Sequence, residues 1–457
     1  MTDTVLLGNG VVLAGSIGGD SFQTNVIAGG AVAWSGDCIV AVGPESDLRR
    51  ELPNARFLDA HGGLVLPGLI NIHHHFYSSL ARGLDPKAKM TNFAEVLDRL
   101  WWRLDRALDR DTIRVSAELA LADCVRSGCT TVFDHHASPG VIGGSLDIIA
   151  QAVESAGLSA ILCYEVTDRN GHDDALAGLD ENIRFSDARR DDPRIRGTLG
   201  LHASFTLRDE TIIEAARRCP DVGCHIHVAE DPVDVDQSVE RFGVGPVERL
   251  HRQGLLGPRS LLAHGIHLGR QDYHAIAEHD ATIIHNPESN ANNGVGHLDV
   301  QRTVQEGCLV GLGTDGMSSS MLRSLRSAFL LQRHETRDPS AGFSALPDLL
   351  ANNARVARRF FDEPQLGELS PGAPADIAVI DAPPRTAIDG GNAFAHLVYG
   401  VSEAPVRHTV ARGRIVLEDF HHTSVDTAEL AARARSVAPA LWKRFHALRW
   451  GTSFLGT

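Results

Sequence analysis

The sequence predicts an α/β protein, a (β/α)₈ TIM barrel with a small β-sandwich domain built from both chain ends. The first observation is a rhythm of short apolar runs and longer amphipathic stretches between about residues 68 and 330. Eight buried strands separated by helices are typical of a (β/α)₈ barrel. The second observation is that both chain ends carry short alternating segments with turns, a pattern typical of antiparallel sheet.

The barrel strands are expected at eight runs rich in Val, Ile, Leu and Thr: 68–75, 130–137, 159–166, 196–203, 223–230, 260–267, 281–288 and 308–316. Helices are expected between them, among others at 113–127, 146–156, 210–218, 246–253 and 272–279. The expected domains are a discontinuous β domain over 1–67 and 370–425, a barrel over 68–369 and a C-terminal helix within 426–457.

The two chain ends have the same texture. Short strands are expected at 6–13, 31–34 and 38–42, and again at 376–380, 409–412 and 415–417. We expect them to form two halves of one small domain, with two unrelated appendages as the alternative. The Ala- and Arg-rich stretch 427–448 has helical periodicity and predicts a surface or packing helix.

Composition excludes several classes of protein. A chain of 457 residues with 43% hydrophobic and 22% charged residues is typical of a soluble globular protein. Its formal charge of −15 disfavours nucleic acid and anionic membranes as partners. The longest apolar stretches are too short to span a bilayer. Seven scattered cysteines without a CxxC pair predict buried thiols in a reducing cytoplasm.

Reactive side chains gather at the ends of the expected strands, which in a barrel of this kind meet at one rim. His73 and His75 are two residues apart on the first strand, so both imidazoles can face the barrel axis. The alternative is a histidine-rich strand end that only bonds its neighbours. His227 is followed by Glu230 just past the fifth strand, a spacing that suits metal-assisted hydrolysis.

Asp315 follows the eighth strand within the segment GLGTDG, where it could otherwise be the N-cap of a helix. His264 lies at the end of the sixth strand. Together, His73, His75, His227 and Asp315 offer three imidazoles and one carboxylate. This set suits one divalent ion, Zn²⁺ or alternatively Fe²⁺, with a position left for water.

The motifs HxH, HxxE, AHG and GTDG resemble those of the amidohydrolase superfamily in its mononuclear aminohydrolase branch. LVLPGLINIH (64–73) and LSPGAPADIAVI (369–380) are similar to the segments that open and close the family's barrel. Further segments resemble SsnA-type aminohydrolases, which are related to 8-oxoguanine and guanine deaminases and chlorotriazine hydrolases; these segments are 100–112, 134–146, 167–171, 225–231 and 285–296.

This resemblance implies roles for individual residues. It makes His73, His75, His227 and Asp315 metal ligands, Glu230 a proton relay to a ring nitrogen, and His264 a group that orients water. His202 matches a substrate-contacting segment in which Ser204 and Phe205 replace the usual Pro and Tyr. Expected substrate contacts, from their places at or beyond strand ends, are Tyr77, His136, His202, Asn286 and Ser289.

Lysine is scarce, and this bears on the number of metal ions. Binuclear cyclic amidases of the superfamily bridge two ions with a carboxylated lysine, but this chain has no lysine between residues 90 and 442. A single ion is therefore expected.

The expected function is hydrolytic deamination of a nitrogen heterocycle, such as a purine or pterin, by a metal-bound hydroxide, with Glu230, His264 and Asp315 as catalytic groups. The alternatives are hydrolysis that expels chloride or sulfide, a mononuclear cyclic amidase, and a non-enzymatic scaffold. Trp101 and Trp102 are expected in the core rather than on a substrate ring, and 287–297 is either a pocket wall or a solvated turn. Family habit implies a homo-oligomer.

Overall fold

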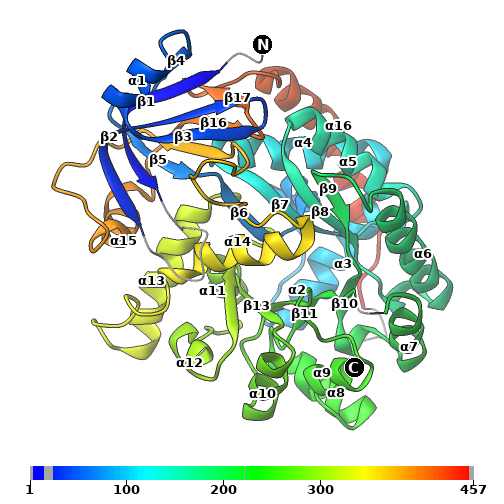
Figure 1. The fold of residues 1–457 in the computed structure, drawn as a ribbon. Helices are drawn as coiled ribbons and strands as arrows, with labels where there is room; N and C mark the ends of the chain where they lie inside the picture. Colours follow the sequence, from blue (N-terminus) through cyan, green and yellow to red (C-terminus); the bar gives the residue numbers. More distant parts are fainter. Residues whose placement is uncertain (1–3, 15–23, 221, 452–457) are drawn as a thin grey trace.

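The computed structural model describes residues 4–14, 24–220 and 222–451. The expected ranges 1–67 and 426–457 therefore lie partly outside the described residues, at 1–3, 15–23 and 452–457. Figure 1 shows a barrel ringed by helices, with a small sheet domain at one corner where the N-terminal strands lie beside strands from the C-terminal part.

The barrel has parallel strands at all eight expected places. They are β6 (Leu69–His74), β7 (Cys129–His136), β8 (Ser159–Tyr164), β9 (Ile195–Gly197) with β10 (Gly200–Ala203), β11 (His225–Val228), β12 (Leu261–His264), β13 (Thr282–His285) and β14 (Leu309–Leu312). The expected fourth strand is split into β9 and β10. The two resulting sheets join through bridges between Val166 and Leu201 and between His74 and Asp315, which close the barrel.

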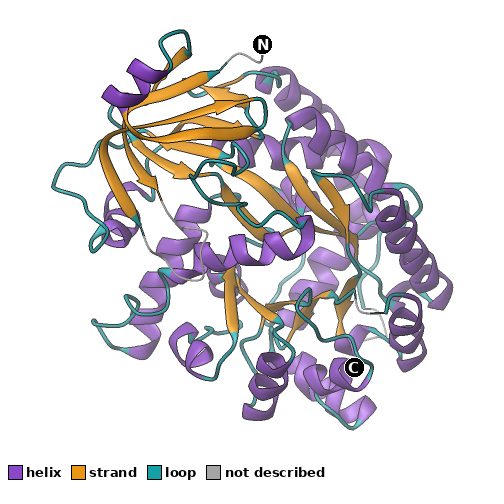
Figure 2. Cartoon of the chain, viewed as in Figure 1, coloured by secondary structure: helices purple, strands orange, loops and turns teal. Residues whose placement is uncertain are grey.

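Helices cover the outside of the barrel (Figure 2). They are α4 (Arg110–Arg126), α5 (Ser145–Ala156), α6 (His172–Ala188), α7 (Asp209–Arg218), α8 (Pro232–Phe242), α9 (Pro246–Arg252), α10 (Arg270–Glu278), α11 (Pro287–Asn293), α12 (Val300–Gln305), α13 (Met321–Thr336) and α14 (Asp348–Phe361). The five helices named from the sequence are confirmed to within a few residues at each end.

Both chain ends build one nine-stranded sheet. Its strands are β1 (Val5–Ala14), β2 (Asn25–Ser35), β3 (Cys38–Pro44), β4 (Arg56–Asp59), β5 (Leu64–Pro67), β15 (Ile377–Ile380), β16 (Val406–Ala411), β17 (Arg414–Glu418) and β18 (His421–His422). Strands β5 and β15 pair antiparallel and so join the two halves. The sheet curls around its own core, and Cys38 bridges to Pro374. The alternative of two unrelated appendages is wrong.

The segment after β6 and the last helix pack together. The segment contains η1 (Phe76–Ala81), α2 (Phe93–Val96), the π-helical turn η2 (Leu97–Trp101) and α3 (Trp102–Ala107), and the last helix is α16 (Thr427–Ala447). Trp442 donates to the Leu80 carbonyl at 2.9 Å, and buried Arg103 donates to the Phe445 carbonyl at 3.0 Å. Helix α16 thus braces this segment. The remaining short elements are α1 (Glu45–Glu51), η3 (Asp168–Asn170), η4 (Ser204–Thr206), α15 (Ala393–Ala395) and η5 (His396–Val401).

The cysteines and the apolar helices bear on two expectations drawn from composition. All seven cysteines are free, and six of them are buried, Cys38 being the exposed one. Across the described ranges, no helix combines the length and apolar character needed to cross a membrane.

Asn353 of α14 connects the first and last barrel strands. Its amide nitrogen donates to the carbonyls of Ile70 and Leu312 at 2.7 and 2.8 Å. Its amide oxygen accepts from Leu312 N at 2.8 Å. The side chain is fully buried, so these backbone groups would lose their partners without it.

We expect Asn353→Ala to lower the free energy of unfolding by about 2–4 kcal/mol, because unpaired buried backbone groups are costly. Urea unfolding followed by circular dichroism measures the change. Asn54→Ala, at an exposed turn, is the control and should stay near wild type. An equally stable Asn353→Ala protein would show that Asn353 does not secure the barrel closure.

Candidate active site

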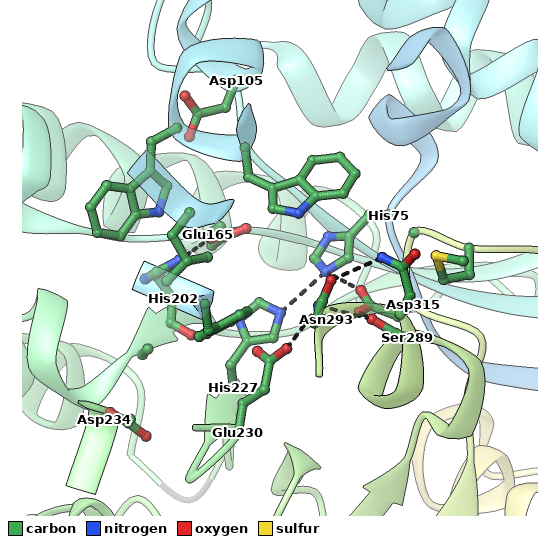
Figure 3. Close-up of a pocket in the computed structure, with 18 of the residues that line it drawn as sticks. His75, Asp105, Glu165, His202, His227, Glu230, Asp234, Ser289, Asn293 and Asp315 are labelled. Atoms are coloured by element: carbon green, nitrogen blue, oxygen red, sulfur yellow. Dashed lines mark hydrogen bonds and ion pairs between the residues drawn. The ribbon is translucent and has the colours of Figure 1, made fainter. Parts of the chain in front are cut away.

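Four side chains from distant parts of the chain meet at the C-terminal mouth of the barrel. His73, His75, His227 and Asp315 each offer one ligand atom, and these atoms all lie within 4.8 Å of one another. His75 Nε2 lies 3.1 Å from His227 Nε2 and 3.1 Å from Asp315 Oδ1, and His73 Nε2 lies 3.5 Å from the same oxygen. Figure 3 shows His75, His227 and Asp315 pointing toward one another.

Hydrogen bonds fix how these imidazoles are oriented. His75 Nδ1 donates to the His135 carbonyl at 2.6 Å, and His227 Nδ1 donates to the His202 carbonyl at 2.8 Å. His73 Nδ1 lies 2.8 Å from His225 Nε2. Because every Nδ1 is occupied in this way, each ring turns its Nε2 atom toward the common point, as in histidines that bind metals.

The cluster favours positive charge at this point. Burial would raise the pKa of Asp315, but hydrogen bonds with His73 and His75 hold it well below its usual range. Burial would likewise lower the pKa of His75, yet its hydrogen bond and charge interaction with Asp315 raise it to about 9. An ionised carboxylate among buried imidazoles is an environment that attracts a cation.

Glu230 and His264 lie beside Asp315, and the three form a second group of potential ligands. Burial, reinforced by the charge of Asp315, raises the pKa of Glu230 well above its usual range. Its carboxyl accepts from Asn293 Nδ2 at 3.3 Å and lies 3.5 Å from His264 Nε2. His264 Nδ1 donates to Asn290 Oδ1 at 2.8 Å, which leaves His264 Nε2 facing the site.

The backbone is strained where the catalytic candidates lie. His264, Asp315 and Ala229 have φ values of 77°, 52° and 49°, in the left-handed region that residues with a Cβ rarely adopt. Asp234 accepts a 2.7 Å hydrogen bond from Ala229 N, and Asp315 N donates to the His73 carbonyl at 3.0 Å. Such strained residues, held by their surroundings, are found at functional sites.

A pocket opens above this cluster. Its lining includes His75, Tyr77, Trp101, Trp102, Asp105, Glu165, His202, Phe205, His227, Glu230, Ser289, Asn293 and Asp315. Trp102 is buried in an apolar cluster, as expected, and also contributes to this wall. The sequence left open whether 287–297 is a pocket wall or a solvated turn. Most of this segment is helix α11, whose Ser289 and Asn293 line the pocket, so it is a pocket wall.

The expected substrate contacts fall into two sets. Tyr77, His202 and Ser289 line the pocket, and Ser289 donates a short hydrogen bond to Asp315. His136 and Asn286 do not line it. His136 bonds Ser138 at 2.9 Å, and Asn286 is fully buried and bonds the Ile284 carbonyl. Successive residues of a strand point to opposite sides, which places His135 rather than His136 beside the histidine cluster.

Glu165 was not predicted from the sequence as a site residue. It directly follows β8, is 4% exposed, and faces His202 from the pocket wall. The signal was present in the sequence, because Glu165 is the acidic residue at the end of the third expected strand. Asp105 was also missed; it lines the same wall, is buried and pairs with Arg169 at 3.0 Å.

Known proteins resemble this chain along most of its length. A 5-methylthioadenosine/S-adenosylhomocysteine deaminase of Nitratidesulfovibrio vulgaris is 30% identical over 427 residues, covering 92% of this chain and 94% of that protein. A 5′-deoxyadenosine deaminase of Methanothermobacter thermautotrophicus is 31% identical, covering 79% and 84% of the two chains. A zinc-bound adenosine deaminase from Xanthomonas campestris has the same fold, with a TM-score of 0.83, 24% identity and coverage of 98% and 99%.

The amidohydrolase family matches residues 64–416, which span the barrel and the strands that join it to the small domain. The resemblance of the motifs to the amidohydrolase superfamily is thereby confirmed. The chain belongs to the amidohydrolase family, whose members hydrolyse carbon–nitrogen bonds, and is an enzyme of that kind.

Proposed function

We propose that the chain hydrolytically deaminates a small nitrogen heterocycle with one divalent ion, Zn²⁺, held by His73, His75, His227 and Asp315. The observation that carries this proposal is the convergence of four ligand atoms. Three of the separations between these atoms, 3.1–3.5 Å, are close to the roughly 3.3 Å between neighbouring ligands of tetrahedral zinc. A set of three imidazoles and one carboxylate suits Zn²⁺, with Fe²⁺ as the alternative.

A bound ion of this kind supplies Lewis acidity and lowers the pKa of water toward ~7. The residues around it then divide the proton transfers. Glu230, whose pKa burial raises above its usual range, donates to the ring nitrogen next to the reacting carbon. His264 turns Nε2 toward the site and orients the attacking water, and Asp315 accepts its proton. Ammonia leaves after protonation.

The names of the relatives support release of ammonia. Both curated relatives are named deaminases of adenine nucleosides, so small heterocycles are the substrate class that they favour. Expulsion of chloride or sulfide and opening of a cyclic amide receive no such support from them. Zinc as the metal, the cytoplasm as the location and assembly into a homo-oligomer remain predictions.

We expect His227→Ala to reduce bound metal from about one ion per chain to a small fraction, because a ligand at the centre of the set is removed. Inductively coupled plasma mass spectrometry of the purified protein, loaded with Zn²⁺ and desalted, measures this. His274→Ala, on an exposed face of α10, should keep its metal. Full metal content in His227→Ala would contradict the assignment of the site.

Glu230→Gln should retain the metal but lower turnover by at least ~10²-fold, because the amide cannot donate a proton as the acid does. Ammonia release from purines, pterins, pyrimidines and triazines provides the assay. The control is Glu210→Gln, on an exposed turn of α7, which should react like wild type. Near-normal turnover by Glu230→Gln would rule out the proton relay.

A further inference from the structure

Asn293 lies in the pocket wall but has no part in the mechanism above. It is the last residue of α11 and follows Ser289 by four positions, so the two side chains lie on one face of the helix. Both line the pocket, and Asn293 is only partly buried. Figure 3 shows its side chain between those of Glu230 and Ser289. Its amide is therefore placed to act on both neighbours.

The hydrogen bonds of Ser289 show how the Asn293 amide is oriented. Ser289 Oγ donates its single hydrogen to Asp315 Oδ2, so toward Asn293 it can only accept. The atom that faces it, 3.4 Å away, must therefore be the amide nitrogen Nδ2. The amide oxygen agrees with this orientation, because it accepts from Asn292 Nδ2 at 3.1 Å. Asn293 thus turns a donor with two hydrogens toward the site.

Glu230 receives the second hydrogen of this amide. Asn293 Nδ2 lies 3.3 Å from Glu230 Oε1, which accepts from it. An oxygen that accepts in this way serves as the carbonyl oxygen of a carboxylic acid, so in the acid form of Glu230 the proton is on Oε2. Oε2 lies 3.5 Å from His264 Nε2, the atom that faces the site. Glu230 is 8% exposed and lines the pocket, so a substrate can meet this carboxyl.

The hydrogen bond from Asn293 becomes stronger when Glu230 gives up its proton. Hydrogen bonds to an ionised carboxylate are roughly twice as strong as those between neutral groups. Donation to a ring nitrogen turns the acid into a carboxylate, and Asn293 is already in place to stabilise it. An interaction that is stronger after proton transfer than before lowers the barrier of the chemical step rather than strengthening substrate binding. The effect of Asn293 is therefore expected in kcat.

The other hydrogen of the amide supports the proposed proton acceptor. By donating to Ser289 Oγ, Asn293 turns the Ser289 hydroxyl toward Asp315 Oδ2. The second oxygen of Asp315, Oδ1, is the one that lies beside His73 and His75. One amide thus orients both the acid that gives a proton and the aspartate that takes one.

We propose that Asn293 is a positioning residue that makes Glu230 donate through Oε2 and that stabilises the carboxylate left by this donation. This inference rests on the proposed function. In the step concerned, the lone pair of the ring nitrogen takes the proton, the Oε2–H bond breaks, and its electron pair stays on Glu230. The ring gains one positive charge and Glu230 gains one negative charge.

The test is a double-mutant cycle with Glu230→Gln, read by ammonia release from the heterocycle that wild type turns over fastest in the panel above. Asn293→Leu, which removes the amide at similar size, should lower kcat of the zinc-loaded enzyme about 10-fold. KM should change by less than about twofold. In the Glu230→Gln background the same substitution should change kcat by less than about twofold, because no acid remains to be positioned.

Two further variants control for bulk and for folding. Asn293→Ala leaves less bulk in the pocket and should lower kcat to the same extent as Asn293→Leu. Asn54→Leu, at an exposed turn, should react like wild type.

A measurement without turnover separates this inference from the proposed function. The infrared difference spectrum between wild type and Glu230→Gln, recorded at a pH low enough to protonate Glu230, isolates the carbonyl band of its acid form. Removal of the Asn293 hydrogen bond should move this band to higher wavenumber, because a carbonyl that accepts a hydrogen bond vibrates more slowly. Such a shift would support the contact even if wild type released no ammonia, a result that would defeat only the proposed function.

Three results would overturn the role of Asn293. One is an equal loss of kcat in the wild-type and Glu230→Gln backgrounds, which would show that Asn293 acts independently of Glu230. Another is a rise in KM with kcat unchanged, which would make Asn293 a substrate contact alone. The third is an unchanged Glu230 band in Asn293→Leu.

Discussion

One electrostatic constraint organises the mouth of the barrel: several buried imidazoles and a carboxylate turn their lone pairs toward the same point. Each Nδ1 of His73, His75 and His227 is engaged by a protein group, so the Nε2 atoms have no freedom to turn away. Acceptors facing one another in an apolar interior are unfavourable unless a positive charge lies between them. The depressed pKa of Asp315 and the raised pKa of His75 likewise show that this point of the structure favours positive charge.

Residues that close the barrel also belong to the site. The bridge between His74 and Asp315 joins the last strand position to the first; Asp315 is itself one of the four clustered ligand candidates, and His74 lies between two others, His73 and His75. Asn353 of α14 ties the same strands together. A distortion where the first and last barrel strands meet would therefore displace the proposed metal ligands directly. The hydrogen bonds that stabilise the closed barrel also hold these ligands in place.

The sequence was sufficient to find residues whose position follows from strand alternation. His73, His75, His227 and Asp315 stand at strand ends, and the (β/α)₈ pattern alone brings strand ends together. It pointed to His136 as a substrate contact, whereas His135 is the residue beside the histidine cluster, because the inward-facing member depends on the register at the end of β7. It also could not show that α11 is helical, since a short segment with three Asn and Pro287 has weak helix propensity.

Glu165 illustrates a different limit. Its place at the end of a strand was readable, but its partners were not, because the state of the Glu165–His202 pair depends on Thr206 and Ala203. A single hydroxyl, four residues from His202, decides where the proton lies. Such assignments follow only from three-dimensional hydrogen-bond networks.

Helix α16 supports one wall of the pocket although it is far in sequence from the residues that form that wall. Arg103 donates to the Phe445 carbonyl and Trp442 to the Leu80 carbonyl, so the wall formed by the segment after β6 rests on residues near the C-terminal end of the described chain. During synthesis the ribosome releases this helix last among the described elements. The barrel strands can pair beforehand, but the nascent enzyme can acquire a fully walled pocket only once translation has passed Phe445.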